Sequence, residues 1–179
     1  MNYTYAKKKA KEITSQMTQY EKLSQLLYFC PAIERLGIKE YNWWNEALHG
    51  VARAGVATVF PQAIALSSTW DPELIKQVST VISDEARARW NELDQGRLQT
   101  QQFSDVLTFW SPTVNMSRDP RWGRTPETYG EDPHLTSEIG TAFVQGLQGD
   151  DPRYLKVVST PKHFAVNNQE YNRLANNSI

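Results

Sequence analysis

The chain has 179 residues, which suits one domain and falls short of the roughly 250 residues of a closed barrel of eight strands and eight helices. Its 19 basic and 20 acidic residues give a formal charge of -1, so no bulk charge attracts nucleic acid or an anionic membrane. Hydrophobic residues make up 40%, which excludes a disordered chain. The single cysteine, Cys30, excludes an internal disulfide and a multi-cysteine metal site within this chain.

The N-terminal segment is basic but has no apolar core, so it does not match a secretory signal. No stretch approaches the ~20 apolar residues that a membrane helix needs. Together with the lone cysteine, these features favour a cytoplasmic location and no membrane partner.

The opening stretch is expected to be helical. Thr18 and Glu21 have the spacing of a capping box, in which each residue satisfies a free backbone N–H of the other. Leu23, Leu26 and Leu27 follow this box. Proline and glycine interrupt the pattern soon afterwards.

Two longer helices are predicted from their caps. Asp71 and Asp132 can each accept from free N–H groups, and each precedes a proline that suits the first helical position. An apolar stripe follows Asp71, made of Leu74, Val78, Val81, Ile82, Ala86 and Trp90. A ladder with a period of four follows Asp132, made of Leu135, Ile139, Phe143 and Leu147, and Gly149 ends that helix.

Three short apolar or aromatic runs, residues 38–44, 106–110 and 155–159, are predicted strands. Their alternation with helices predicts an α/β fold with a parallel sheet, either open and doubly wound or part of a closed barrel. No glycine-rich phosphate-binding turn follows a strand, which argues against nucleotide binding. In both architectures the functional groups lie at the carboxyl ends of the strands.

The segments after the strands carry charged and aromatic residues side by side. A sugar hydroxyl both donates and accepts, so its site needs carboxylates together with Arg, Lys or His. Candidate groups are Glu46, Arg124, Lys162 and His163, and indoles can pack on the sugar ring, here Trp43, Trp44 or Trp122. Purely structural roles stay open: Glu46 at a helix start, and Lys162 with His163 as a loop pair.

Other polar residues favour structural interpretations. An ion-pair lattice could tie down the long loop through Arg118, Asp119, Arg121 and Arg124, and this is the favoured role for Arg118 and Asp119. Asp119 also opposes any basic groove for nucleic acid. His49 suits a helical position satisfied by the backbone, and His134 suits solvent. The three histidines lack metal-ligand spacing, so no metal is expected. Glu127, Glu131 and Asp132 could look like an acid/base set, but Asp132 is expected to cap a helix. No G-x-S-x-G elbow supports a serine hydrolase.

Four segments, in order, resemble glycoside hydrolase family 3. They are YNWWNEALHGVA at 41–52, VFPQAI at 59–64, SPTVNMSRDPRWGRTPETYGEDP at 111–133 and Lys162-His163-Phe164. The first segment is similar to the branch with β-xylosidases and related β-glucosidases or α-L-arabinofuranosidases. The likeness runs from about Lys11 to the end of the chain.

The resemblance implies a fold, an activity and residue roles. Residues 1–179 would be the N-terminal part of a TIM-barrel-like (β/α)8 domain, incomplete in this chain and without a second domain. The parent enzyme would be a retaining, exo-acting β-xylosidase or β-glucosidase of carbohydrate catabolism that needs no cofactor. Glu46, Arg124, Lys162 and His163 would hold the terminal sugar of an oligosaccharide or β-glycoside.

Two departures limit the expected activity. The residues after Phe164 read AVNNQE, which disfavours the family's β-N-acetylglucosaminidases. The S/T-D-W motif of the family's nucleophile is absent, so catalytic groups are expected beyond residue 179 and the chain alone is expected to be inactive. The alternative is a non-catalytic carbohydrate-binding module of the same fold. The choice between xylose, glucose and arabinose stays open.

Overall fold

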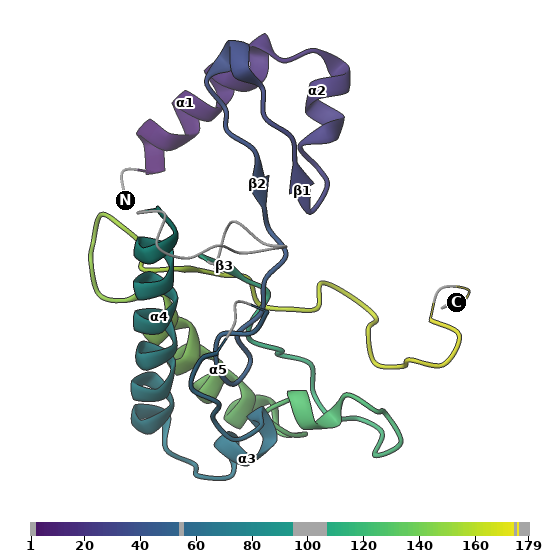
Figure 1. Ribbon diagram of the computed structural model, residues 1–179. Helices are drawn as coiled ribbons and strands as arrows, with labels where there is room; N and C mark the ends of the chain where they lie inside the picture. Colours follow the sequence, from purple (N-terminus) through teal and green to yellow (C-terminus); the bar gives the residue numbers. More distant parts are fainter. Residues whose placement is uncertain (1–2, 54–55, 95–106, 174, 176–179) are drawn as a thin grey trace.

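The structure is a computed structural model that describes residues 3–53, 56–94, 107–173 and 175. The main body consists of a short parallel strand pair and three helices, α3 (Ala63–Ser67), α4 (Pro72–Asp94) and α5 (Pro133–Gln148) (Figure 1). Two further helices, α1 (Tyr3–Gln16) and α2 (Gln19–Ser24), stand at one end with an antiparallel strand pair. Among the described residues no helix is long and apolar enough to cross a membrane.

The N-terminal helices are α1 (Tyr3–Gln16) and α2 (Gln19–Ser24). The predicted capping box is present, because the Glu21 amide donates to Thr18 Oγ1 at 3.2 Å and the Thr18 amide donates to Glu21 Oε2 at 2.7 Å. Leu23, Leu26 and Leu27 are nevertheless exposed. Local capping therefore starts α2, and the three leucines in and after it do not join the main core.

The prediction of a first parallel strand at 38–44 is wrong. Only Tyr41–Asn42 form a strand there (β2), and it pairs antiparallel with β1 (Phe29–Cys30), with Phe29 opposite Asn42. The connection between them contains the short 3₁₀ helix η1 (Glu34–Leu36), which ends at Gly37 with φ of 66°. A glycine accepts this left-handed conformation at little cost, and the turn brings the two strands together.

Helix α3 (Ala63–Ser67) precedes the long α4 (Pro72–Asp94). As predicted, Asp71 caps α4, accepting from the Leu74 amide at 3.0 Å. The apolar stripe is only partly correct: Val78, Ile82 and Ala86 are buried, but Leu74 and Val81 are each more than a third exposed. The fully buried Ile75 takes the position that the pattern assigned to Leu74.

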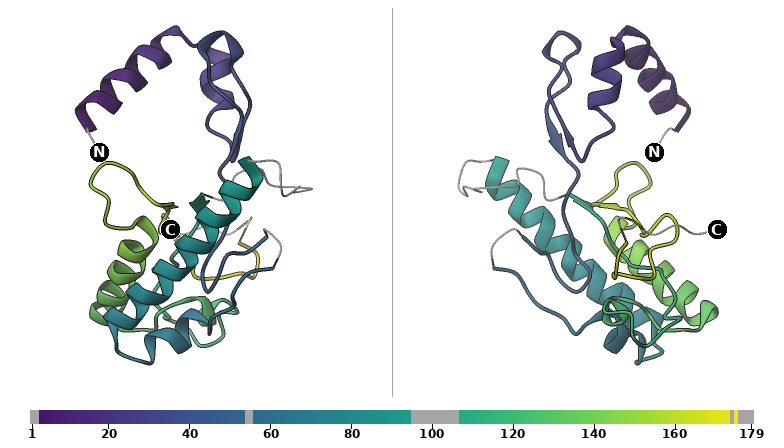
Figure 2. Two further views of the ribbon diagram at one scale, coloured as in Figure 1. Left: turned by 60° about the vertical axis from the view of Figure 1, so that its left-hand side comes forward. Right: turned by 90° about the vertical axis from the view of Figure 1, so that its right-hand side faces the viewer.

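Helix α5 (Pro133–Gln148) confirms the predicted cap and ladder. Asp132 accepts from the Leu135 amide at 2.6 Å, and Ile139, Phe143 and Leu147 are fully buried. Figure 2 shows α4 and α5 running side by side. The two helices come close together at Gly146, whose carbonyl oxygen accepts from Ser83 Oγ at 3.0 Å.

Strands β3 (Thr108–Phe109) and β4 (Val158–Ser159) pair in parallel on either side of α5 in the chain, which confirms a β–α–β unit. The predicted second strand began at Val106, which lies outside the described residues. The chain after β2 joins this pair, because the Trp110 amide donates to the Asn45 carbonyl at 2.9 Å. A parallel bridge between Thr113 and Lys162 extends the contact past the strand ends.

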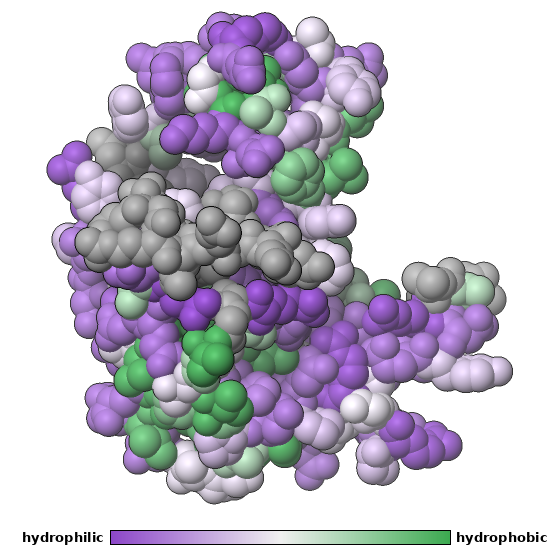
Figure 3. All heavy atoms as spheres, in the orientation of Figure 1, coloured by the Kyte–Doolittle hydropathy of each residue, from purple (hydrophilic) through white to green (hydrophobic). Residues whose placement is uncertain are grey.

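The core lies between the helices and this strand pair, and its largest fully buried side chains include Tyr129, Phe109 and Phe143. On the face seen in Figure 3, hydrophobic side chains gather over the lower part of the molecule, where α3 and α4 lie. The fold is thus mixed α/β, as predicted. The three segments that follow β2, β3 and β4 converge on one another.

Candidate functional site

A cleft of about 870 Å³ opens where the segments after β2, β3 and β4 converge. All four predicted sugar-binding residues line it: Glu46 follows β2, Arg124 comes from the long segment after β3, and Lys162 and His163 follow β4. The structure therefore brings together distant residues, such as Glu46 and Lys162, which are 116 positions apart in the sequence.

Glu46 and Lys162 form the first charge pair of the cleft. Lys162 Nζ lies 3.0 Å from Glu46 Oε1. The Lys162 side chain is 14% exposed and the Glu46 side chain is 25% exposed. The backbone of Lys162 is held on both sides, because its amide donates to the Pro112 carbonyl at 2.9 Å and its carbonyl accepts from the Val114 amide at 2.8 Å. The ammonium group is therefore fixed near one carboxylate oxygen.

Arg124 and Glu127 form the second pair, at the two ends of the 3₁₀ helix η2 (Thr125–Glu127), for which Arg124 is the N-cap residue. Arg124 Nε and Nη2 donate to the two oxygens of Glu127 at 2.8 and 2.6 Å. Burial favours a higher pKa for Glu127, but the hydrogen bonds and charge of Arg124 outweigh it and hold this pKa below the ordinary value. Glu127 is thus an ionised partner of Arg124.

His163 connects to the second pair. Its Nε2 lies 3.2 Å from Arg124 Nη1, its Nδ1 lies 2.9 Å from Asn115 Oδ1, and the peptide bond between Lys162 and His163 is cis. Burial, followed by the charges of Arg124 and Lys162, lowers the pKa of His163, and this outweighs the opposite effect of Glu127 and Glu170. The ring is therefore neutral near neutral pH.

Two stacked indoles form an aromatic wall of the cleft. The rings of Trp44 and Trp110 have centroids 6.0 Å apart and planes inclined by 13°, and the Arg53 guanidinium lies 5.1 Å from the Trp44 ring centroid. Of the three predicted wall residues only Trp44 lines this cleft. Trp43 instead packs edge-on against Tyr41 and donates from Nε1 to Cys30 Sγ.

Trp122, the third predicted wall residue, is almost fully buried and lines a smaller neighbouring hollow of about 350 Å³. Asp119 and Arg121 line the same hollow and form an ion pair with a shortest distance of 2.6 Å, as the structural interpretation predicted. Arg121 holds the pKa of Asp119 down to about 2. Arg118 donates to Asn168 Oδ1 at 3.3 Å.

The remaining predicted residues lie outside the cleft. His49 is not helical as expected, but its Nδ1 does meet a backbone oxygen, the Phe60 carbonyl, at 2.8 Å. His134 is exposed at the start of α5, and Asp132 is used as its cap. Cys30 is buried. Within the described part of the chain, no cluster of three or more His, Cys, Asp or Glu side chains is suited to hold a metal.

Several residues that line the cleft or contact its lining residues escaped the sequence analysis. Trp110 ends the predicted strand 106–110, so its place at a strand end was an available signal. Arg53, Asn115 and the pairing role of Glu127 had no comparable signal, because each depends on contacts between distant segments or on the fold of η2.

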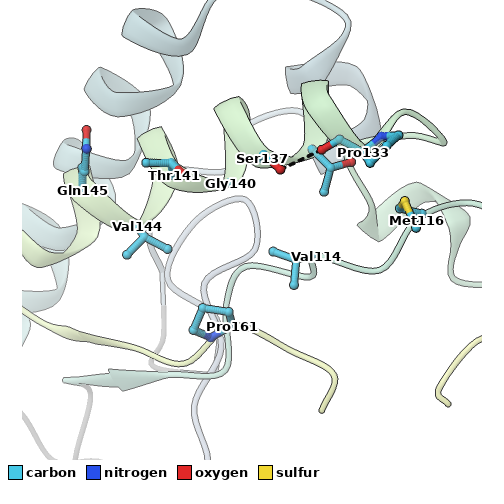
Figure 4. A pocket seen from close by; sticks show the side chains of 10 residues that line it. Val114, Met116, Pro133, Ser137, Gly140, Thr141, Val144, Gln145 and Pro161 are labelled. Atoms are coloured by element: carbon cyan, nitrogen blue, oxygen red, sulfur yellow. Dashed lines mark hydrogen bonds between the residues drawn. The ribbon is translucent and has the colours of Figure 1, made fainter. Parts of the chain in front are cut away.

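A second, mostly apolar hollow of about 490 Å³ lies beside α5 (Figure 4). Thr141 and Val144 of α5 face Val114 and Pro161 across it, and no charged side chain lines it. Pro161 lines both this hollow and the charged cleft. Of the two, only the charged cleft offers charged partners to a ligand.

The charged cleft combines fixed donors, fixed acceptors and an aromatic wall. Lys162 and Arg124 supply only donors to the cleft, whereas Glu46 supplies only acceptors. A neutral molecule rich in hydroxyl groups can exchange hydrogen bonds with all of them, since each hydroxyl both donates and accepts. The combination of a carboxylate acceptor, cationic donors and an indole surface is the set of groups that a sugar needs.

Comparisons with known proteins agree with this chemistry. The glycosyl hydrolase family 3 N-terminal domain matches residues 13–171. A xylan 1,4-beta-xylosidase of Xylanibacter ruminicola is 44% identical over 174 residues, which cover 94% of this chain and 20% of that protein. The chain thus spans about a fifth of the length of this relative.

Two solved structures have the same local fold. A GH3 exo-beta-xylosidase in complex with a xylobiose aziridine activity-based probe matches 92% of this chain and 21% of its own, with a TM-score of 0.76 and 34% identity. Beta-glucosidase 3B from Thermotoga neapolitana, in complex with alpha-D-glucose, matches 93% of this chain and 24% of its own, with a TM-score of 0.71 and 28% identity. The chain belongs to glycosyl hydrolase family 3 and carries the fold of that family's N-terminal domain.

Proposed function

We propose that this chain forms the sugar-holding part of a retaining, exo-acting β-glycosidase that releases terminal xylosyl or glucosyl units. The observation that carries the proposal is the cleft itself: Glu46, Arg124, Lys162 and His163 converge in it from three segments, next to the Trp44–Trp110 stack. The similarity to a xylan 1,4-beta-xylosidase and to an exo-beta-xylosidase structure supports xylose as the preferred sugar.

In this proposal the cleft holds the sugar at its hydroxyl groups. Glu46 accepts from one hydroxyl, Lys162 and Arg124 donate to neighbouring oxygens, and an apolar face of the sugar ring packs on the indole wall. These hydrogen bonds strengthen as the sugar flattens towards the oxocarbenium-like transition state, so the residues affect the rate as well as the binding.

The reaction itself needs two further carboxyl groups about 5–5.5 Å apart, one to attack the anomeric carbon and one to protonate the leaving oxygen. Among the described residues, three carboxylates near the charged groups of the cleft are each engaged by a cation: Glu46 by Lys162, Glu127 by Arg124, and Glu170 by Arg173. We therefore assign the attacking and proton-donating groups to other parts of a longer polypeptide. The β–α–β unit around α5 would be part of a (β/α)8 barrel.

Two measurements test this function. Calorimetric titration of the 179-residue chain with xylose and glucose is expected to show binding that Lys162→Met weakens at least tenfold, while Asp119→Asn, at an exposed ion pair beside the cleft, leaves it unchanged. The protein encoded by the complete reading frame that contains this chain is expected to hydrolyse 4-nitrophenyl β-xyloside faster than the corresponding glucoside.

The outcomes separate the alternatives. Binding without hydrolysis by the complete protein would favour a non-catalytic carbohydrate-binding module. Hydrolysis by the 179-residue chain alone would show that the catalytic carboxylates lie within it. The absence of both binding and hydrolysis would refute the proposed function.

A further inference from the structure

Asn115 lies between His163 and the segment that follows it. Its Nδ2 is 2.6 Å from the Asn167 carbonyl oxygen and 3.3 Å from Asn168 Oδ1. A backbone carbonyl can only accept, so the amide group of Asn115 must turn its NH₂ towards residue 167. The other end of the amide, Oδ1, then faces His163.

Oδ1 of Asn115 determines where the proton of the imidazole lies. It accepts from the backbone amide of His163 at 3.1 Å and lies 2.9 Å from the ring Nδ1. Since an amide oxygen carries no proton, Nδ1 must be the donor of the second bond. Asn115 therefore specifies a ring protonated at Nδ1.

The opposite side of the ring gives the same answer independently. Nε2 lies 3.2 Å from Arg124 Nη1, and a guanidinium group can only donate. Nε2 must therefore accept through its lone pair, and a proton there would point at a cation. Two neighbours from the segment between β3 and α5, one an acceptor and the other a donor, select a single neutral tautomer.

We propose that Asn115 is a positioning residue of the cleft, which holds His163 as the Nδ1–H tautomer so that Nε2 is a hydrogen-bond acceptor. The consequence for the ligand rests on the proposed function. A sugar hydroxyl placed between Nε2 and Arg124 would donate a hydrogen bond to Nε2, and its oxygen would accept one from Arg124 or Lys162. A protonated ring would lose this acceptor.

The charged groups around His163 support a neutral ring in the working range of pH. Arg124 and Lys162 oppose its protonation, and burial of the side chain does so more strongly than either. Glu127 and Glu170 act in the opposite direction, but each also pairs with an arginine, Glu127 with Arg124 and Glu170 with Arg173. The carboxylate of Glu46 is paired with Lys162.

Long-range ¹H–¹⁵N NMR of the ¹⁵N-histidine-labelled chain tests the tautomer without any ligand. His49→Gln and His134→Gln variants assign the three imidazoles. We expect His163 to show a protonated Nδ1 and a bare Nε2 between about pH 6.5 and 8, and to titrate below the ordinary histidine pKa of about 6.5. A wild-type ring protonated at Nε2 would overturn the proposal, and this measurement needs no change at Asn115.

Two substitutions separate positioning from simple packing. Asn115→Asp keeps an acceptor oxygen at Nδ1 and adds a negative charge, so the Nδ1–H tautomer should persist while the titration midpoint rises by about one unit or more. Asn115→Leu has a similar size but no acceptor, so a population protonated at Nε2 should appear. An unchanged tautomer in the leucine variant would assign the selection to Arg124 alone and refute the role of Asn115.

Adding xylose distinguishes this proposal from the proposed function. If both hold, the Nε2 resonance shifts on titration while Nδ1 stays protonated, and the affinity falls as the pH drops through the His163 midpoint. A proton that moves to Nε2 in the complex would refute the acceptor role. A chain that binds no sugar but keeps the Nδ1–H tautomer would refute only the function.

Discussion

The two carboxylate oxygens of Glu127 accept from Nε and Nη2 of Arg124 at 2.8 and 2.6 Å, and this leaves Nη1 of the guanidinium directed at His163. The ion pair therefore orients the guanidinium group of Arg124 and also compensates its charge. A planar guanidinium that is bound along one edge by a carboxylate can offer only its remaining edge to a ligand.

The first prediction concerns this pair. Glu127→Gln should lower the free energy of unfolding by about 1–2 kcal/mol at pH 7, because it removes charge-assisted hydrogen bonds from a half-buried arginine. The folded-state pKa of Glu127 lies below its unfolded value, so its stabilisation is present above about pH 4.3 and is lost as the pH falls through the folded pKa.

Urea denaturation at several pH values checks the prediction. The difference between wild type and Glu127→Gln should shrink steadily below pH 4. A difference that stays constant down to pH 2.5 would mean that the ion pair contributes nothing and that the variant acts through packing.

A second prediction concerns the coupling of Glu46 and Lys162. Because both side chains are mostly buried, removing either one leaves an unpaired charge in the cleft wall. Glu46→Gln and Lys162→Met should each lower the free energy of unfolding. The loss in the double variant should be smaller than the sum of the two single losses by about 1 kcal/mol or more. A double-mutant cycle by urea denaturation measures this interaction free energy. Additive losses would argue against a stabilising pair.

The third prediction concerns the indole wall. Trp110→Leu should weaken xylose binding by roughly tenfold, about 1.4 kcal/mol, since it removes one partner of the Trp44 stack. Calorimetry is the suitable measurement, because the substitution itself changes tryptophan fluorescence. Trp43→Leu is the control: Trp43 lies outside the cleft, and an equal loss of affinity in both variants would point to a general loss of structure.

The fourth prediction uses two glycines of α5 that differ only in their surroundings. A Cβ on Gly146 would lie 2.0 Å from Ser79 Oγ and 2.4 Å from the Lys76 carbonyl oxygen, so Gly146→Ala forces α4 and α5 apart. We expect a loss of about 2–3 kcal/mol, as is typical of an overpacked core.

Gly140→Ala is the matched control. Its Cβ would meet Val114 Cγ1 at 3.5 Å, an ordinary contact, and alanine is the better helix former by up to about 1 kcal/mol. Thermal unfolding should therefore show a lower midpoint for Gly146→Ala and an unchanged or higher one for Gly140→Ala. Similar midpoints for both would contradict the close helix contact.

The parts of the fold that were predictable are those set by neighbours in sequence. Asp71 and Asp132 cap their helices as expected, because an N-cap needs only an oxygen three residues from a free amide. The parallel strand predicted at 38–44 was wrong, because this segment pairs antiparallel with Phe29–Cys30. The local pattern of residues 38–44 does not specify that partner. Leu74 and Ile75 exchanged roles because the buried side of α4 depends on where α5 lies.

The candidate site was predictable to a different degree. Glu46, Arg124, Lys162 and His163 came from family motifs, and the structure places all four in one cleft. Trp43 and Trp122 were plausible from composition but face elsewhere, because an indole's direction depends on the strand pairing and loop contacts around it. Asn115 had no signal, since its importance lies in contacts with residues about 50 positions away.

The contact between Glu46 and Lys162 closes a loop of 116 residues. The entropy of closing so long a loop must be overcome before the contact contributes anything, whereas the backbone hydrogen bonds of α4 and α5 join residues only about four positions apart. The cleft is therefore expected to form late in folding, after the helices. An intermediate with native helical content would still lack the sugar site, so sugar affinity reports on the last step of folding.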